Sequence, residues 1–472
     1  MPKRVPYVVV AAIGVGLVAV AGGVAFASQR PRYSIDGGTP RLVTTDQSAT
    51  SLIEAHNTPS LAVDPVDDRH LVIAERIDRP RFGCRVHVSN DGGQMWHSVT
   101  VALPGGKDNC FIPDVAFLGR TVYLVYLTLN THPRDPLSGG NDPNGMYLAR
   151  SDDGGQSFGT PLKLPGVDNL QPRLVVDRNA GRLYIVYVKG SPEQNDTPLG
   201  FGPPPNPIMV ISSTDGGQTF SDPVEVSDSK RLRVAAPTPV VAQNGTLFVL
   251  YQDYKGDLDD YNNRATPYQG TFAVMLARST DQGKTFSQVV VDDQQVRPHR
   301  FLIYLPPFPS LAVAPDGNRL YAAWSDGRDG APDVFLRRSD DGGITWQRAT
   351  KVNRRANNRP ANYELPAVAA PTRDQVDIIY YVLTGSTPKN SVEFAYSTDG
   401  GDHFQGRATI SRSFDARVGV ASARDLGRVD WGDHLALFAP SPTRAFAAWS
   451  DSSRGTTDTQ RQDIVMASVS LR

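Results

Sequence analysis

The chain has 472 residues and a formal net charge of -1, and its 42 glycines and 37 prolines exceed average usage. Glycine and proline disfavour helix interiors, so the composition argues against a mostly helical protein. A hydrophobic fraction of 40% with balanced charge excludes a disordered chain. Near-neutrality also removes the electrostatic footprint of a nucleic-acid binder.

The N-terminus carries an uncharged apolar run over residues 8–27, preceded by two basic residues. This pattern is typical of an export segment, and Ala25 and Ala27 supply small residues where a signal peptidase reads the chain. The run is also long enough to span a bilayer, so an uncleaved anchor is the alternative. We therefore expect a signal peptide or membrane anchor over 1–30 and one domain over 31–472, outside the cytoplasm.

A motif of the form Ser-x-Asp-x-Gly-x-x-aromatic occurs six times, with starts 58 to 66 residues apart. Its Ser and Asp accept hydrogen bonds from turn amides, its Gly supplies a positive φ, and its aromatic residue packs beside a hairpin. We interpret each copy as a structural hairpin turn; the alternative, a calcium loop, has too few oxygen ligands. The copies lie at 89–96, 151–158, 213–220, 279–286, 339–346 and 397–404.

Strand-like runs recur around each motif. Strand A follows a proline or a polar loop, strand B is aromatic and β-branched, strand C runs into the motif and strand D leaves it. Seven A–B–C units occur but only six motifs, because 463–471 ends the sequence where the seventh motif would stand; the stretch 41–45 is expected to supply the missing strand. Strand A is expected at 59–64, 113–118, 172–177, 237–242, 309–314, 366–371 and 433–438.

The sequence therefore predicts an all-β fold, a single β-propeller of seven four-stranded blades closed by both ends of the chain. The motifs are expected between strands C and D. Six blades are the fallback, if one unit is irregular.

The predicted blades separate short turns from long loops. The A–B and C–D turns share one face, which we call the box face, and the B–C and D–A connections share the other, which we call the loop face. The loop face holds nearly all the long connections, for example 252–271 and 411–433. Such loops on a rigid scaffold are typical of binding or catalysis. Cys84 and Cys110 belong to this face, and a disulfide between them is expected to tie two of its loops.

The repeated motif resembles the Asp-box (BNR) repeat of sialidases and related secreted propellers, from about residue 56 to the end. The resemblance is specific for architecture, since the repeat also occurs in non-enzymatic propellers. A sialidase would offer an arginine cluster for the sugar carboxylate, a Tyr nucleophile with a Glu partner, and an Asp acid/base. The segment that matches the family's Phe/Tyr-Arg-Ile-Pro motif is His56-Asn57-Thr58-Pro59, so Asn57 stands in the Arg position.

Candidate site residues are chosen by position, because the D–A loops feed the innermost strands. The expected catalytic residues are Tyr363 and Glu364 as a nucleophile pair, with Asp114 and Asp430. Adjacent residues in a strand point to opposite sides, so only an irregular backbone lets Tyr363 and Glu364 face one substrate. For every candidate the alternative is a loop cap or a salt bridge between blades. The expected substrate-binding residues are Asn109, Gln171, Arg173, Arg300, Arg359 and Asp433, and His299 also qualifies.

Two B–C connections, 324–333 and 449–463, repeat a Trp-x-Asp…Arg…Asp arrangement. Such Asp-Arg-Asp sets are expected to pin loops rather than to catalyse.

Two functions follow from this reading. One is an exported sialidase-like exo-glycosidase that binds and hydrolyses glycans on the loop face. The other, favoured by Asn57, is a non-catalytic extracellular propeller that binds a glycan or a protein with the same face. No cofactor is expected, because no Gly-rich phosphate loop follows a strand and opens a helix. No metal-ligating residue is assigned, and the metalloprotease signature His-Glu-x-x-His is absent. We expect no nucleic-acid partner, a membrane contact only through 1–30, and a monomer.

Overall fold

The computed structural model describes residues 33–44, 54–79, 82–129, 131–132, 135–139, 145–166, 169–190, 204–257, 270–296, 308–355, 361–384, 390–415, 417–419 and 431–472. All of them belong to one compact unit, 32–472. Within these ranges the regular elements are β-strands, and no helix has the length and apolarity needed to cross a membrane. The expected export segment, 8–27, lies outside the described residues.

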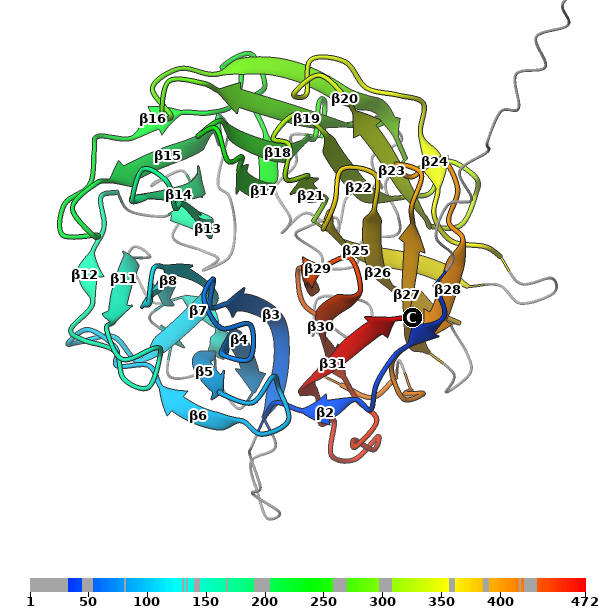
Figure 1. Ribbon diagram of the computed structural model, residues 1–472. Coiled ribbons are helices and arrows are strands. Elements are labelled where there is room, and N and C mark those ends of the chain that lie inside the picture. Colours follow the sequence, from blue (N-terminus) through cyan, green and yellow to red (C-terminus); the bar gives the residue numbers. More distant parts are fainter. Residues whose placement is uncertain are drawn as a thin grey trace, which may run out of the picture. The chain divides into compact units, whose positions relative to one another are not determined.

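Seven antiparallel sheets surround a central axis as the blades of a propeller (Figure 1). Blades I to III consist of β3 (Ala55–Val63), β4 (Leu71–Arg79), β5 (Gly83–Ser89) and β6 (His97–Thr100); β7 (Asn109–Leu118), β8 (Thr121–Leu129), β11 (Gly145–Ser151) and β12 (Leu162–Lys163); and β13 (Asn169–Asp177), β14 (Arg182–Lys189), β15 (Ile208–Ser213) and β16 (Val224–Glu225). A small pair, β9 (Thr131–His132) and β10 (Asp135–Gly139), lies in the B–C connection of blade II.

Blades IV to VI repeat the same order. They consist of β17 (Val234–Val241), β18 (Leu247–Asp253), β19 (Phe272–Ser279) and β20 (Ser287–Gln295); β21 (Ser310–Val313), β22 (Leu320–Asp326), β23 (Asp333–Ser339) and β24 (Thr350–Lys351); and β25 (Asn362–Ala369), β26 (Val376–Leu383), β27 (Ser391–Ser397) and β28 (Gly406–Thr409). The prediction of an all-β propeller with seven four-stranded blades is confirmed, and the six-bladed fallback is not needed.

Both ends of the chain build blade VII. Its inner strands are β29 (Ala436–Ser441), β30 (Arg444–Asp451) and β31 (Asp463–Leu471). The outer edge of β31 is covered by β2 (Arg41–Leu42), where Arg41 pairs with Met466, and by β1 (Ile35–Asp36), where Ile35 pairs with Leu471. Two short strands thus do the work of one outer strand, and the sequence did not reveal the first of them.

The apolar core is divided among the interfaces between neighbouring blades. Between blades III and IV, for example, Tyr184 and Val186 pack with Val249 and Tyr251, all four fully buried. A side chain on either face of a blade is therefore in the core, which is why strand B reads as a continuous apolar run.

A bulge interrupts strand A at the same place in five blades. In each, a residue with a positive φ precedes a proline, and the strand pairing shifts register there. Proline has no N–H to give to the ladder, so the pairing must be interrupted at this point. The residues with positive φ are Thr58, Ile112, Gln171, Ala236 and Leu365, with φ between 46° and 57°.

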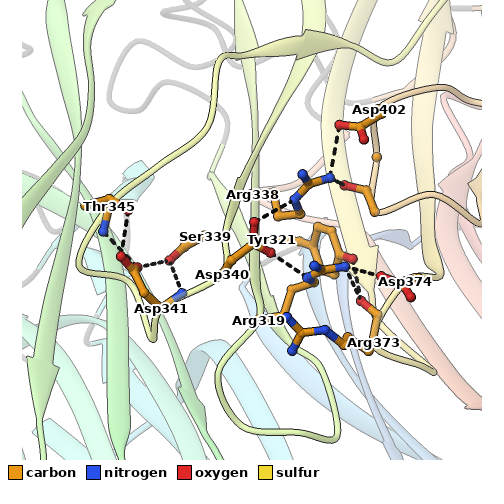
Figure 2. Close-up of polar contacts among 12 residues, drawn as sticks. Arg319, Tyr321, Arg338, Ser339, Asp340, Asp341, Thr345, Arg373, Asp374 and Asp402 are labelled. Atoms are coloured by element: carbon orange, nitrogen blue, oxygen red, sulfur yellow. Dashed lines mark hydrogen bonds and ion pairs between the residues drawn. The ribbon is translucent and has the colours of Figure 1, made fainter. Parts of the chain in front are cut away.

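The Asp boxes form the C–D turns, as predicted. In blade V, Asp341 Oδ1 accepts the Ser339 hydroxyl at 2.8 Å and the amide of Thr345 at 2.8 Å, and Oδ2 accepts the Thr345 hydroxyl at 2.6 Å (Figure 2). Beside this turn, Arg338 of β23 reaches the box of blade VI, where Nη1 lies 2.8 Å from the Gly400 carbonyl oxygen. The box of blade V therefore closes its own hairpin, and the box of blade VI also offers a carbonyl oxygen to the adjacent blade.

Candidate functional site

Seven equivalent residues of the strand A segments surround the axis, one in each blade; in six blades this residue directly follows a proline. We call them the ring positions. All seven line an axial cavity of about 730 Å³. The cavity extends from the ring positions to the A–B turns of blades III and IV on the box face, where Asn179 and Gln243 line it. The ring positions are Ser60, Asp114, Arg173, Thr238, Ser310, Ala367 and His434.

Several ring side chains join one blade to the next. The Ser60 hydroxyl donates to Asp114 Oδ1 at 2.5 Å, and Asp114 Oδ2 accepts the amide of Leu174 at 2.7 Å. Further round the ring, Thr238 donates to the Pro309 carbonyl oxygen at 2.8 Å. Asp114, expected to be catalytic, is 4% exposed and has both oxygens hydrogen-bonded, so it holds blades I, II and III together.

Arg173 reaches across the axis from blade III to blade VII. Its Nη1 lies 2.9 Å from Nε2 and 3.1 Å from Nδ1 of His434, and its Nε lies 3.3 Å from Asp114 Oδ2. Burial and the charges of Arg173 and Arg76 hold the pKa of His434 well below its ordinary value, so this imidazole is neutral and accepts from the guanidinium. A guanidinium, an imidazole and a carboxylate thus meet at the loop-face end of the cavity.

A buried ion cluster lies beside this contact. Arg76 of β4 contacts Asp433 Oδ2 through Nη1 at 3.0 Å and Asp78 Oδ1 through Nε at 2.8 Å. Asn57, the residue in the family's Arg position, lies opposite Arg76 in the strand register and donates to Asp78 Oδ2 at 2.7 Å. Burial raises the pKa of Asp433, although Arg76 opposes the shift. Asn57 therefore helps to hold a carboxylate of the protein.

The other expected site residues either bond to neighbouring protein groups, lie away from the axial cavity, or lie outside the described residues. Gln171 accepts the Ala236 amide through Oε1 at 2.7 Å, and Asn109 donates to Asp108 at 2.6 Å. The Tyr363 hydroxyl donates to the Arg354 carbonyl oxygen at 3.0 Å, and its ring packs edge-on against Tyr380 in the apolar cluster between blades V and VI. Glu364 is 3% exposed. Tyr363 and Glu364 are not among the residues that line the axial cavity. Asp430, Arg300, Arg359 and His299 lie outside the described residues.

The expected disulfide is present. Cys84 at the start of β5 and Cys110 in β7 are bonded, with their Cα atoms 5.4 Å apart. Phe82 and Phe111, each close in sequence to one of the cysteines, pack edge-on with ring centroids 5.0 Å apart. The bond fixes blade I to blade II at the loop face.

A polar chain crosses all four strands of blade I, buried as far as His87 and ending at the exposed Ser98. His56 Nδ1 lies 2.8 Å from the Glu75 carboxylate, which lies 3.1 Å from Nε2 of His87, whose Nδ1 lies 3.0 Å from the Ser98 hydroxyl. Burial alone would lower the pKa of His56, but Glu75 and Glu54 raise it to about 9. Burial lowers the pKa of His87. Sequence analysis missed this chain, because its members lie on four different strands and form no local motif.

The Asp-Arg-Asp segments pin loops, as expected. Arg328 contacts Asp326 through Nε at 2.8 Å and Asp292 of blade IV through Nη2 at 2.8 Å. In the second segment, Arg461 Nε lies 3.0 Å from Asp463 Oδ2. In the part of the chain that the structure describes, no group of three His, Cys, Asp or Glu residues is arranged to hold a metal ion.

Comparisons with known proteins agree with this architecture. A family model described as BNR/Asp-box repeat matches residues 337–348, the turn of blade V. No curated protein sequence matches the chain.

Many solved structures resemble the fold, among them the following three. A protein of unknown function from Dyadobacter fermentans is 15% identical with a TM-score of 0.50, over 77% of this chain and 99% of that one. A Hadza microbial sialidase is 20% identical with a TM-score of 0.46, over 70% and 64%. The α-L-arabinanase of Penicillium chrysogenum is 14% identical with a TM-score of 0.45, over 79% and 99%. The match thus spans 64% of the length of the microbial sialidase. At these identities the likeness concerns the fold alone.

Proposed function

We propose that this Asp-box propeller binds a glycan at the loop-face end of its axial cavity. The observation that carries the proposal is the contact between Arg173 and His434 across the axis, beside Asp114. Sugar hydroxyls both donate and accept hydrogen bonds, so they suit a site where a guanidinium, an imidazole and a carboxylate converge. The resemblance of the repeats to those of sialidases supports the same ligand class.

Local charge favours a neutral glycan over a carboxylated one. Arg76 faces Asp78 and Asp433, and Arg173 faces Asp114. At the loop-face end of the cavity, these two described arginines therefore face three carboxyl groups of the protein. A sialic acid carboxylate needs guanidinium groups free to bind it bidentately. We therefore propose a neutral, hydroxyl-rich sugar as the ligand.

The test is binding of the purified protein to a panel of neutral and sialylated glycans, followed by calorimetry on the best ligand. Arg173→Gln should weaken binding about tenfold or more, which is about 1.4 kcal/mol. Arg69→Gln is the matched control, because Arg69 is exposed and pairs with Asp67 in a box-face turn. Binding that survives Arg173→Gln unchanged, or a preference for sialylated ligands, would contradict the proposal.

Hydrolysis is the second candidate, and the state of Asp433 favours it. Burial raises the pKa of Asp433, and a carboxyl group with a raised pKa is what a glycosidase needs as its general acid. Fluorogenic glycosides, sialosides included, test this with Asp433→Asn, Asp430→Asn and Tyr363→Phe. Turnover that Asp433→Asn abolishes while binding persists would make the protein a hydrolase. Binding without turnover of any substrate would make it a binding module.

We propose also that the propeller works outside the cytoplasm, as a secreted or anchored monomer. The Cys84–Cys110 disulfide supports this, because such bonds persist in oxidising compartments. N-terminal sequencing of the mature protein from fractionated cells distinguishes a cleaved signal peptide from an anchor. Recovery of the intact chain in the cytoplasm would contradict the proposal.

A further inference from the structure

One strand carries an arginine to each end of the axial cavity. Arg173 lies within β13 at the loop-face end, and Arg178 follows the last residue of β13 at the box-face end. Five residues of extended chain separate them by roughly 16 Å. The two guanidinium groups therefore belong to opposite ends of one cavity.

The two arginines differ in their partners. Arg173 is held by His434 and Asp114. Arg178 has neither a hydrogen bond nor an ion pair with any residue that the structure describes. Although much of Arg178 is exposed, the protein around its guanidinium lowers its pKa by burial, and the more distant charge of Asp64 only partly opposes the shift. A partly desolvated guanidinium is normally paired with a carboxylate or a carbonyl oxygen, and Arg178 has no such partner among the described residues.

The carboxylates beside Arg178 are engaged elsewhere. Asp177 accepts the amides of Asn179 at 3.1 Å and Ala180 at 3.0 Å. Asp64 accepts the Val66 amide at 2.8 Å and lies 3.1 Å from His70. Asp177 Oδ1 and both oxygens of Asp64 therefore serve the turns of the protein.

Two arginines in other box-face turns are neutralised. Arg69 in blade I pairs with Asp67, and Arg373 in blade VI pairs with Asp316 of the neighbouring turn. Arg178 has no such partner among the described residues, and neither has Arg120 of blade II, but of these four arginines only Arg178 lines the axial cavity, with Asn179 and Gln243. One N–H of the Asn179 side-chain amide donates to the Gln243 carbonyl oxygen at 2.7 Å, which leaves the other for a ligand.

We propose that the box-face end of the axial cavity is a second binding site, which takes an oxyanion group against Arg178, with Asn179 and Gln243 as neutral donors. A guanidinium matches two oxygens of a carboxylate, phosphate or sulfate at once. The site is distinct from the glycan site, because it lies at the opposite end of the cavity.

The experiment is calorimetric titration of the full-length protein with sodium sulfate, inorganic phosphate and acetate, at an ionic strength matched with sodium chloride. We expect saturable binding of at least one oxyanion and none of chloride. Arg178→Gln should weaken it about tenfold or more, the effect of losing a charge-assisted bidentate contact. Which probe binds best identifies the oxyanion.

Two variants make the result specific. Arg120→Gln removes an exposed arginine from the blade II turn, outside the axial cavity, and should leave the affinity within about twofold because its charge is screened there. Arg173→Gln should also leave the affinity for the oxyanion unchanged. The proposal is overturned if no oxyanion binds saturably, if Arg120→Gln weakens binding as much as Arg178→Gln, or if Arg173→Gln abolishes it.

Discussion

Gly343 of the blade V Asp box lies against Leu276 of blade IV so closely that a Cβ on residue 343 would stand 2.4 Å from Leu276 Cδ2. The same glycine of other boxes meets the preceding blade in the same way: Gly401 meets Leu336 and Gly217 meets Leu148. The second glycine of the box is therefore needed for contact between blades as well as for its positive φ.

Gly343→Ala should destabilise the protein by about 2–4 kcal/mol, through backbone strain together with overpacking of the interface. Gly106→Ala is the matched control, because Gly106 has a similar φ of 79° and nothing within 4 Å of an added Cβ. It should lose only about 1 kcal/mol, the strain alone. Denaturant unfolding measures both variants, and equal losses would show that the interblade contact is unimportant.

Stability should decline at alkaline pH because of His56. Its folded pKa of about 9 exceeds the ordinary value of 6.5, so the favourable contribution is complete below pH 6.5 and disappears as pH rises through 9. Urea unfolding at pH 6, 7.5 and 9 should reveal a loss of about 2 kcal/mol. His56→Gln should lower stability at pH 6 and flatten this dependence. A wild-type protein equally stable at pH 6 and 9 would contradict the assignment.

Asp377 should make the protein less stable as pH rises toward neutrality. Burial raises its pKa from 3.8 to about 7, and the side-chain amide of Gln375, 3.1 Å away, opposes the shift. The folded state then keeps a proton that the unfolded chain releases, so stability falls between pH 3.8 and 7. Asp377→Asn should be more stable than wild type at pH 8 by about 1–3 kcal/mol and no different at the lower end of the window. Thermal unfolding across this range is the measurement, and a variant destabilised at pH 8 would refute it.

Removing the disulfide between blades I and II should lower the stability of the folded protein. The bond closes a loop between residues 26 apart, and in the loop-entropy model its loss costs about 3 kcal/mol. The Cys84→Ser/Cys110→Ser protein should unfold at a lower temperature, and reducing agent should lower the Tm of wild type but not of the variant. A Tm insensitive to reducing agent in both proteins would contradict this expectation.

The regular parts of the fold could be read from the sequence because the repeats carry their own chemistry. The Ser and Asp of each box specify a turn, and aromatic strand B runs specify a buried sheet, so blade number and order followed. The bulges did not follow, because a left-handed residue such as Thr58 or Leu365 before proline is a rare conformation that local propensity opposes.

The site was less predictable for the same reason. Sequence position suggested Asp114, Arg173 and Asp433 as axial residues, and of these Asp114 and Arg173 line the axial cavity. It gave no sign that Arg173 would contact His434 of blade VII. Tyr363 was placed near the axis by its loop, whereas its ring lies between blades V and VI. The positions of these side chains depend on how the seven blades pack against one another, and the spacing of strands in the sequence does not specify that packing.

The way in which blade VII is completed also determines when the ring can close during folding. Val43, near the beginning, is fully buried and donates its amide to the carbonyl oxygen of Ile464, near the end. During synthesis this partner does not exist until residue 464 has emerged. Six blades can stack in order before then, but the ring stays open, and residues 33–44 stay unpaired. The closing step therefore waits for β31, and its loop-closure entropy falls on a single late event.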